Sequence, residues 1–187
     1  MIWWIRHGPT HARGMVGWSD INADLSDAAA ISRLRASLPH SATLVSSDLK
    51  RTIQTANALC LDAVRLAPSA DLRELNFGAW ELRTHDEIEA EDPDRIRSFW
   101  ETPGAVTPPG GESWDTLSAR VETAVQGLLA EHDQIIAVAH FGVILSQVQR
   151  AMGWQGKEAF AQRIEPLSLT CITYGPERCA GPINHRP

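Results

Sequence analysis

Short, continuous apolar runs constrain the fold of this 187-residue chain more than any other feature of its sequence. The runs at residues 2–5, 42–45 and 135–139 are each four or five residues long and rich in strand-forming side chains. Such runs are typical of strands that are buried on both faces of a parallel sheet. The segment 64–66 is a weaker candidate, and residues 167–174 alternate in polarity as a half-buried or edge strand does.

Segments with the character of helices separate these runs. Ser26 or Asp27 can cap a helix that ends before Pro39, and the cluster at residues 46–48 can cap a helix over residues 49–61. Two further helices are expected, one over residues 113–131, whose apolar residues follow a helical period, and one over residues 143–152. Alternating strands and helices predict an α/β fold, a three-layer α/β/α sandwich around a mostly parallel sheet.

The segment from about residue 81 to 111 differs from the rest of the chain. It is acidic at first, carries Pro93 at the start of a short helical stretch, and returns through a loop rich in proline and glycine at residues 108–111. We expect it to form a short inserted helical lid within a single domain that spans residues 1–187. The tail after Gly175 holds three prolines and is expected to be coil.

Charge and cysteine content narrow the class of protein. The formal net charge is −6, which repels polyanions, so we expect no nucleic-acid partner. Three widely spaced cysteines fit neither a disulfide framework nor a zinc ribbon, and they indicate reduced thiols in the cytoplasm. No apolar run approaches the length of a membrane helix and no signal peptide is expected, so we expect a cytoplasmic protein with no membrane partner.

Histidines and arginines follow the apolar runs. Arg6 and His7 come after the first run, Arg51 lies one helical turn after the second, and His140 ends the third. Because the carboxyl ends of parallel strands form the ligand crevice of such a sheet, these side chains are expected to meet at one edge. Two arginines and two histidines gathered in an otherwise acidic protein predict a phosphate site, since guanidinium groups match phosphate oxygens in bidentate fashion.

Five blocks, in order along residues 2 to about 145, resemble the histidine phosphatase (phosphoglycerate mutase-like) superfamily. They are RHGPT at residues 6–10, SSDLKRTIQTA at 46–56, LRELNFGAWE at 72–81, PGGES at 109–113 and AHFG at 139–142. The resemblance implies a phosphatase that forms a phosphohistidine on His7. It also implies a fold of the expected α/β class.

The resemblance implies a role for each site residue. His7 is the nucleophile, Glu74 donates the proton to the leaving oxygen, and His140 stabilises the transferred group. The residues expected to bind substrate are Arg6, Arg51, Thr10, Arg13, Phe141 and Gly142. Should Glu74 not be the acid, Glu81 or Glu112 is the next candidate. No metal and no cofactor is expected, because side chains supply the positive charge that phosphoryl transfer needs.

Some positions depart from the family pattern. Arg13 stands where the family usually has Asn, and it either contacts phosphate or faces solvent. Phe141 stands where Gly is common, which places its ring at the pocket rim or in the core. Leu82 replaces a usual Gly. Arg95 and Arg97, in the expected lid, are candidates for contacting a second anionic group of a substrate.

Three functions are compatible with these features. The first is a phosphomonoesterase that acts on a small molecule, and the residues 17–20 and the short lid are similar to the alpha-ribazole phosphatase branch. The second is a phosphoglycerate mutase-type isomerase, although such enzymes generally carry a longer insertion. The third is a non-catalytic phosphate-binding module. The sequence identifies neither the physiological substrate nor the oligomeric state.

Overall fold

The computed structural model describes all 187 residues and is built around a five-stranded sheet. The strands are β1 (Ile2–Arg6), β2 (Thr43–Ser46), β3 (Ile135–Ala139), β4 (Leu169–Thr173) and β5 (Cys179–Ala180), in the order β2-β3-β1-β4-β5. β1, β2 and β3 run parallel, whereas β4 pairs antiparallel with β1, and β5 with β4. The predicted α/β class with a mostly parallel centre is confirmed.

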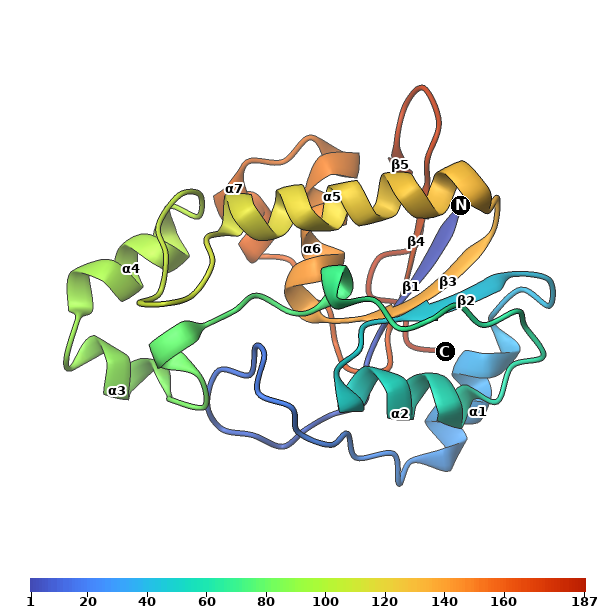
Figure 1. The fold of residues 1–187 in the computed structure, drawn as a ribbon, viewed down its shortest axis with the longest axis horizontal. Coiled ribbons are helices and arrows are strands. Elements are labelled where there is room, and N and C mark those ends of the chain that lie inside the picture. The colour runs from blue at the N-terminus through green and yellow to red at the C-terminus, as the bar shows by residue number, and fades with distance from the viewer.

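Helices cover both faces of this sheet (Figure 1). On one side lie α1 (Ala28–Ala36) and α2 (Lys50–Leu59); on the other lie α5 (Trp114–Glu131) and α6 (Phe141–Met152). Three shorter helices, α3 (His85–Glu89), α4 (Pro93–Glu101) and α7 (Gly156–Phe160), and two 3₁₀ turns, η1 (Ala70–Leu72) and η2 (Gly78–Trp80), complete the chain. The expected three-layer sandwich is therefore present.

The alternation of side chains along each strand divides the core between the two faces. Ile2 and Trp4 of β1 belong to a cluster of 24 buried residues with α5 and α6, whereas Ile5 belongs to a cluster of 12 with α1 and α2. Every residue of β3 is buried, as the continuous apolar run predicts for a strand with a neighbour on each side. The sheet is thus held rigid at the edge where β1 and β3 end.

Several local expectations differ from the structure. The weak candidate at residues 64–66 makes only an isolated bridge between Arg65 and Leu44, and the tail expected to be coil contains β5. Helix α2 begins after Leu49, and no side chain caps it. The expectation that the polar cluster at residues 46–48 caps this helix is therefore wrong. These short features depend on tertiary pairing more than on local propensity.

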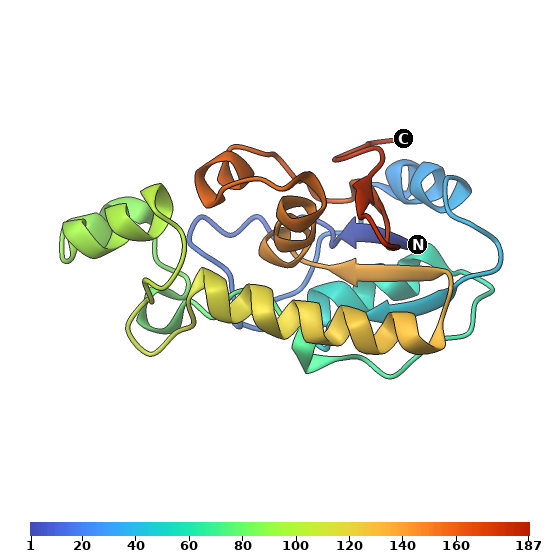
Figure 2. The same ribbon diagram turned by 90° about the horizontal axis from the view of Figure 1, so that it is seen from above.

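The segment 81–111 contains α3 and α4, which lie together at one end of the molecule, beyond the end of the sheet, in both views (Figures 1 and 2). Ile88, Ile96 and Phe99 of this segment join the larger buried cluster. That the segment acts as a lid, and that the chain is one domain, stay predictions. No helix of the structure is both long and apolar enough to cross a membrane.

Leu82, at the start of this segment, adopts a backbone conformation that suits glycine. Its φ is 63°, in the left-handed region, and its side chain is 54% exposed. Its N–H is fixed by a hydrogen bond of 2.7 Å to the Met15 carbonyl, so the strained conformation is held by the surrounding chain. The leucine side chain therefore gives little burial while its Cβ carries the steric cost of the left-handed region.

We expect Leu82→Gly to stabilise the fold by about 1 kcal/mol, because relief of the Cβ clash outweighs the greater freedom of glycine in the unfolded chain. Urea denaturation of both proteins measures this change. Leu82→Ala is the control: it removes the exposed side chain but keeps Cβ. An equal gain from the alanine variant would show that backbone strain at this position is not the cause.

Candidate active site

The parallel pairing of β1 with β3 brings two histidines together. Arg6, the last residue of β1, is in register with Ala139, the last of β3, and the His7 N–H donates to the Ala139 carbonyl at 3.1 Å. His7 and His140 each follow their strand directly, so their rings lie side by side, 5.1 Å apart between centroids and 63° between planes. The topology alone thus places these two rings at the carboxyl edge of the sheet.

Two hydrogen bonds fix the His7 ring. Its Nδ1 lies 2.6 Å from the Gly8 carbonyl, which only accepts, so Nδ1 carries the hydrogen. Its Nε2 therefore holds the lone pair, and the Arg51 Nε–H donates to it at 3.2 Å. This is the orientation that an attack on phosphorus by Nε2 requires.

The protonation of His7 favours the same chemistry. Burial lowers the pKa of His7 to about 3, and the charges of Arg51 and Arg6 act in the same direction, against the effect of the Gly8 carbonyl. Burial, together with the same arginines and His7 itself, lowers the pKa of His140 well below its ordinary value. Both rings are therefore neutral at pH 7.

Arg51 projects from α2 and is completely buried. Besides His7, it donates from Nη1 to the Ser19 carbonyl at 2.9 Å and from Nη2 to the Gly17 carbonyl at 2.6 Å. A guanidinium has five N–H donors, so two remain for an anion. Burial lowers the pKa of Arg51, but an arginine stays charged in proteins.

Buried polar atoms without partners lie beside this cation. Neither of the two ring nitrogens of His140 has a hydrogen-bond partner, and the Nε of Arg6 has none either. The Arg6 guanidinium donates from Nη1 to the Ile164 carbonyl at 2.6 Å and lies over the Phe141 ring at 5.6 Å. Buried polar groups are rarely left unsatisfied, and a bound phosphate would supply the missing acceptors.

Glu74 lies against the N-terminus of α6. One carboxylate oxygen accepts from the Leu75 N–H at 2.9 Å and the Gly142 N–H at 3.0 Å, and the other lies 3.1 Å from the same Gly142 nitrogen. Burial raises the pKa of Glu74, and the two backbone N–H groups and the nearby arginines oppose the rise. A carboxyl group with a raised pKa is suited to donate a proton.

The other two carboxylates considered as acids are occupied elsewhere. Glu81 accepts five hydrogen bonds from the chain around residues 17–19 and 77. Glu112 accepts from the Asn76 N–H and forms an ion pair with Arg120. Glu81 is thus fixed to the backbone of residues 17–19 and Glu112 to a cation, whereas burial raises the pKa of Glu74, so Glu74 remains the carboxylate suited to the acid role.

The remaining predicted site residues are less closely gathered. The Gly142 N–H is bound to Glu74, and a Cβ at this position would lie 2.5 Å from the carboxylate oxygen. Phe141 packs against Arg6 at the rim, and the Thr10 side chain is half-buried without a hydrogen bond. Arg13 is exposed and makes no ion pair. Arg95 and Arg97 are exposed and pair with Asp92 and Glu89.

Sequence reasoning missed the residues that hold these groups in place. The carbonyls of Gly17 and Ser19 fix Arg51. A contact to a backbone carbonyl is not indicated by any pattern of side chains in the sequence. Arg120 of α5 donates to the backbone carbonyls of Asp71, Arg73 and Glu74, and so supports the loop that carries Glu74. A single arginine on a helix gives no sequence signal for such a contact.

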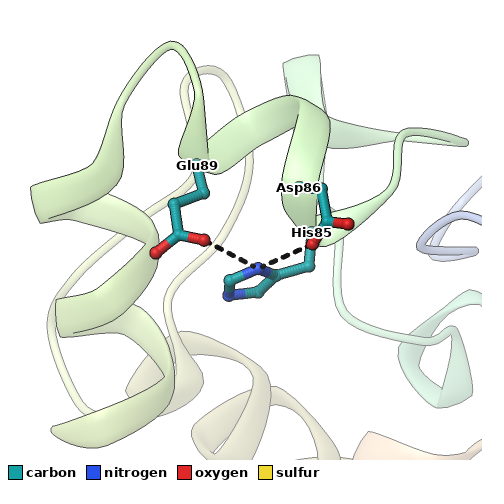
Figure 3. Close-up of side chains that lie close together, drawn as sticks. All are labelled: His85, Asp86 and Glu89. Carbon is teal, nitrogen blue, oxygen red and sulfur yellow. Dashed lines mark ion pairs between the residues drawn. The ribbon is translucent and has the colours of Figure 1, made fainter.

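One group of side chains has the composition of a metal site. His85, Asp86 and Glu89 of α3 lie close together on the surface, with the His85 ring 3.8 Å from Asp86 and 3.7 Å from Glu89 (Figure 3). Arg97 also lies 3.5 Å from Glu89 and competes for that carboxylate. The three are explained as exposed ion pairs of a short helix, and they belong to a segment distinct from the strand ends that carry His7.

The chain belongs to the histidine phosphatase superfamily (branch 1), whose family profile matches residues 2–181. The bifunctional protein Rv2228c of Mycobacterium tuberculosis is 35% identical over 165 residues, which are 85% of this chain and 42% of that protein. The chain therefore spans less than half the length of this relative. Adenosylcobalamin/alpha-ribazole phosphatase of Escherichia coli is 26% identical over 174 residues, covering 88% of this chain and 85% of that protein.

Solved structures share the whole fold. YhfR of Bacillus stearothermophilus superposes with a TM-score of 0.84 at 25% identity, covering 96% of this chain and 93% of that chain. The alpha-ribazole phosphatase from Shigella flexneri, at 24% identity, has a TM-score of 0.81 and covers 99% of this chain and 96% of that chain. The family profile over residues 2–181 confirms the predicted family, and these structures have the same fold as this chain.

The stability of the fold depends on pH, because His7 is buried in its neutral form. Because its pKa is about 3 in the folded state and about 6.5 when unfolded, the unfolded chain binds more protons between these values. Stability therefore falls as the pH drops from about 6.5 towards 3. At pH 5 the loss from this group alone is about 2 kcal/mol.

Between pH 7 and pH 5, we expect the free energy of unfolding of His7→Gln to fall by about 2 kcal/mol less than that of the wild type. Urea denaturation at both pH values measures this difference. The raised pKa of Glu74 has the opposite effect, because it makes the fold more stable as the pH falls towards 4.5. This effect is common to both proteins and does not change the difference between them. His40→Gln, which removes an exposed histidine, is the control. Equal pH dependence in His7→Gln and the wild type would contradict the burial of a neutral His7.

Proposed function

We propose that this protein is a phosphomonoesterase that hydrolyses a small-molecule phosphate ester through a phosphohistidine on His7. The observation that carries the proposal is the His7 Nε2 lone pair, held beside the buried Arg51 guanidinium and the unpartnered His140 ring. In this arrangement a nucleophile lies next to the donors that phosphate oxygens need. Arg6, whose charge lowers the pKa of His7, adds a second cation.

The first step forms a phosphoenzyme. The ester phosphate takes over the Arg51 N–H that points at Nε2, which frees the lone pair to attack phosphorus. The N–P bond forms as the bond from phosphorus to the leaving oxygen breaks. Glu74 gives its proton to that oxygen, which leaves as an alcohol.

The second step regenerates the enzyme. Glu74, now a carboxylate, accepts a proton from water, and the water oxygen attacks phosphorus. The bond to Nε2 breaks and inorganic phosphate leaves. Because the Nδ1–H is held by the Gly8 carbonyl, the ring returns to the same orientation with its lone pair on Nε2.

The surroundings of Glu74 favour an apolar leaving group. A cavity of about 30 Å³ adjoins it, and apart from Glu74 and Gly142 its lining is entirely hydrophobic: Leu75, Phe77, Phe99, Trp100, Trp114, Phe141 and Phe160. The volume admits only the edge of a molecule until the wall formed by α4 and α7 moves. We therefore propose that residues 81–111 act as a lid over a phosphate ester of an apolar or aromatic alcohol, within one domain spanning residues 1–187.

The same surroundings bear on the alternatives. Arg95 and Arg97, the lid cations considered for a second anionic group, are already paired, so the lid offers little to a phosphoglycerate. We place the mutase-type isomerase second, tested by interconversion that depends on 2,3-bisphosphoglycerate. A non-catalytic module stands third, since Arg6, His7, Arg51, Glu74 and His140 are all present. The relatives make an alpha-ribazole phosphate the first substrate to test.

The location and the kind of partner that we propose are supported by the charge and the cysteines of the chain. All three cysteines are free, which suits the cytoplasm that we propose as its location. The net charge of −6 argues for a small-molecule partner rather than nucleic acid.

The decisive experiment separates the roles of His7 and Glu74, with EDTA present throughout. His7→Ala should abolish turnover of every ester and leave no trappable phosphoenzyme. Glu74→Gln should slow hydrolysis of alkyl phosphates by about 100- to 10,000-fold, while it spares much of the phosphorylation burst with p-nitrophenyl phosphate, whose phenolate leaves without a proton. Equal loss of the burst with both esters would rule out Glu74 as the acid. Activity that needs an added divalent ion would rule out the proposed mechanism.

The leaving-group cavity is tested with Phe160→Ala. This change should lower kcat/KM for esters of aromatic alcohols by about tenfold, because an aromatic contact is lost, and leave inhibition by inorganic phosphate unchanged. Lys157→Ala, at an exposed position of the same helix, is the control. A loss of the same size for glycerol phosphate would mean that the cavity does not select apolar leaving groups.

A further inference from the structure

Glu81 is the most heavily hydrogen-bonded carboxylate near the site, and the proposed mechanism does not use it. It follows η2, and all its contacts use it as an acceptor. One oxygen accepts from the Trp18 N–H at 2.7 Å and the Phe77 N–H at 3.2 Å. The other accepts from the Gly17 N–H at 3.1 Å, the Ser19 N–H at 3.1 Å and the Ser19 hydroxyl at 2.7 Å. Three consecutive backbone N–H groups are thus directed at one side chain.

The opposite side of this loop faces Arg51. The peptide group between Gly17 and Trp18 donates its N–H to Glu81 and accepts the Arg51 Nη2–H on its carbonyl at 2.6 Å. A trans peptide directs its N–H and C=O in opposite directions, so carboxylate and guanidinium lie on opposite sides of one peptide unit. The negative charge at the N–H end polarises the carbonyl towards the cation, and the two bonds strengthen one another.

The same loop also reaches the chain that carries the acid. The Trp18 indole N–H donates to the Glu74 carbonyl at 2.8 Å. The loop leaves no space for a side chain at residue 17, since a Cβ on Gly17 would lie 2.1 Å from the Leu75 carbonyl and 2.4 Å from a Glu81 oxygen. The loop therefore fits closely between Glu81, Arg51 and residues 74–75.

We infer that Glu81 is a positioning residue for phosphate binding, and that it acts on Arg51 through the backbone of residues 17–19. The inference rests on the proposed function. A carboxylate in direct contact with Arg51 would occupy N–H groups that phosphate needs. Placed one peptide away, Glu81 fixes the direction of the guanidinium and leaves two of its N–H groups free.

Glu81→Gln tests the inference. Glutamine keeps one accepting oxygen, but its NH₂ group faces backbone donors, so two or three of the five hydrogen bonds are lost. Affinity for inorganic phosphate, measured by calorimetry on the full chain, should fall about 10- to 100-fold. The phosphorylation burst should slow by a similar factor for p-nitrophenyl phosphate and for an alkyl phosphate alike, because Arg51 contacts the transferred group and not the leaving group.

Two further variants control this experiment. Asp27→Asn changes a carboxylate that also accepts from a backbone N–H, that of Ala30, but at the exposed N-cap of α1 and outside residues 81–111. It should leave phosphate affinity and kcat unchanged. Ser19→Ala removes a single contact to Glu81 and should give a smaller loss in the same direction, which keeps the test available if Glu81→Gln does not fold.

The outcomes separate this inference from the proposed function. Calorimetry with phosphate does not depend on turnover, so a wild type that binds phosphate but hydrolyses no ester overturns the phosphatase and still tests Glu81. If Glu81→Gln and Ser19→Ala lower the melting temperature but leave phosphate affinity within about twofold of the wild type, Glu81 is structural only and the inference is wrong. A selective loss for alkyl esters would also overturn it, because Glu81 would then act through Glu74.

Discussion

The buried, unpaired charge of Arg51 is the constraint on which the rest of the site depends. No carboxylate contacts this guanidinium directly, and two carbonyls and a neutral imidazole take the place of water around it. The carboxylates of Glu74, Glu81 and Asp20 act on this cation only from a distance, so its burial stays costly, and carbonyl dipoles offset only part of that cost. The folded protein therefore holds a site whose electrostatic balance improves when an anion enters. We propose that this residual charge attracts the substrate phosphate, in a protein whose net charge of −6 would otherwise repel it.

The same buried charge acts on two titratable groups, but burial drives their pKa values apart. Burial disfavours the charged form of each group, so it lowers the pKa of His7 and raises that of Glu74. The arginines add to the first shift and oppose the second. One environment thus produces a neutral histidine and a carboxyl group inclined to keep its proton, which are the two states that the proposed mechanism requires.

The strand ends were predictable from the sequence because the apolar runs fix the sheet, and the sheet fixes where its strands end. His7 and His140 follow two such runs directly, so their meeting required only that β1 and β3 be parallel neighbours. Arg51 was placed less directly, through one turn of a helix whose start is correct but whose cap is not. The blocks that resemble the family supplied Glu74, which follows no strand.

The contacts that aim these groups were not predictable in the same way. The carbonyls of Gly17 and Ser19 belong to a loop without secondary structure, and carbonyls carry no residue-specific signal. The Gly142 N–H, expected at the substrate, is bound to Glu74 because the N-terminus of α6 offers N–H groups to any nearby carboxylate. The contacts of such backbone groups depend on how a loop and a helix end meet in space. No pattern of residues along the chain indicates this.

The division between strand ends and helices separates the chemistry from the choice of substrate. His7, His140 and Arg6 lie at the ends of strands that are buried on both sides, so their geometry is set by the core. The apolar cavity beside Glu74 is lined instead by side chains of residues 74–77 and of four helices: Phe99 and Trp100 of α4, Trp114 of α5, Phe141 of α6 and Phe160 of α7. Phe141 joins the two parts, since its ring contacts Arg6 and lines the cavity. Under the proposed function, changes in residues 81–111 or in α7 would therefore alter the leaving group that is accepted without moving His7, whereas a change at Phe141 would affect both.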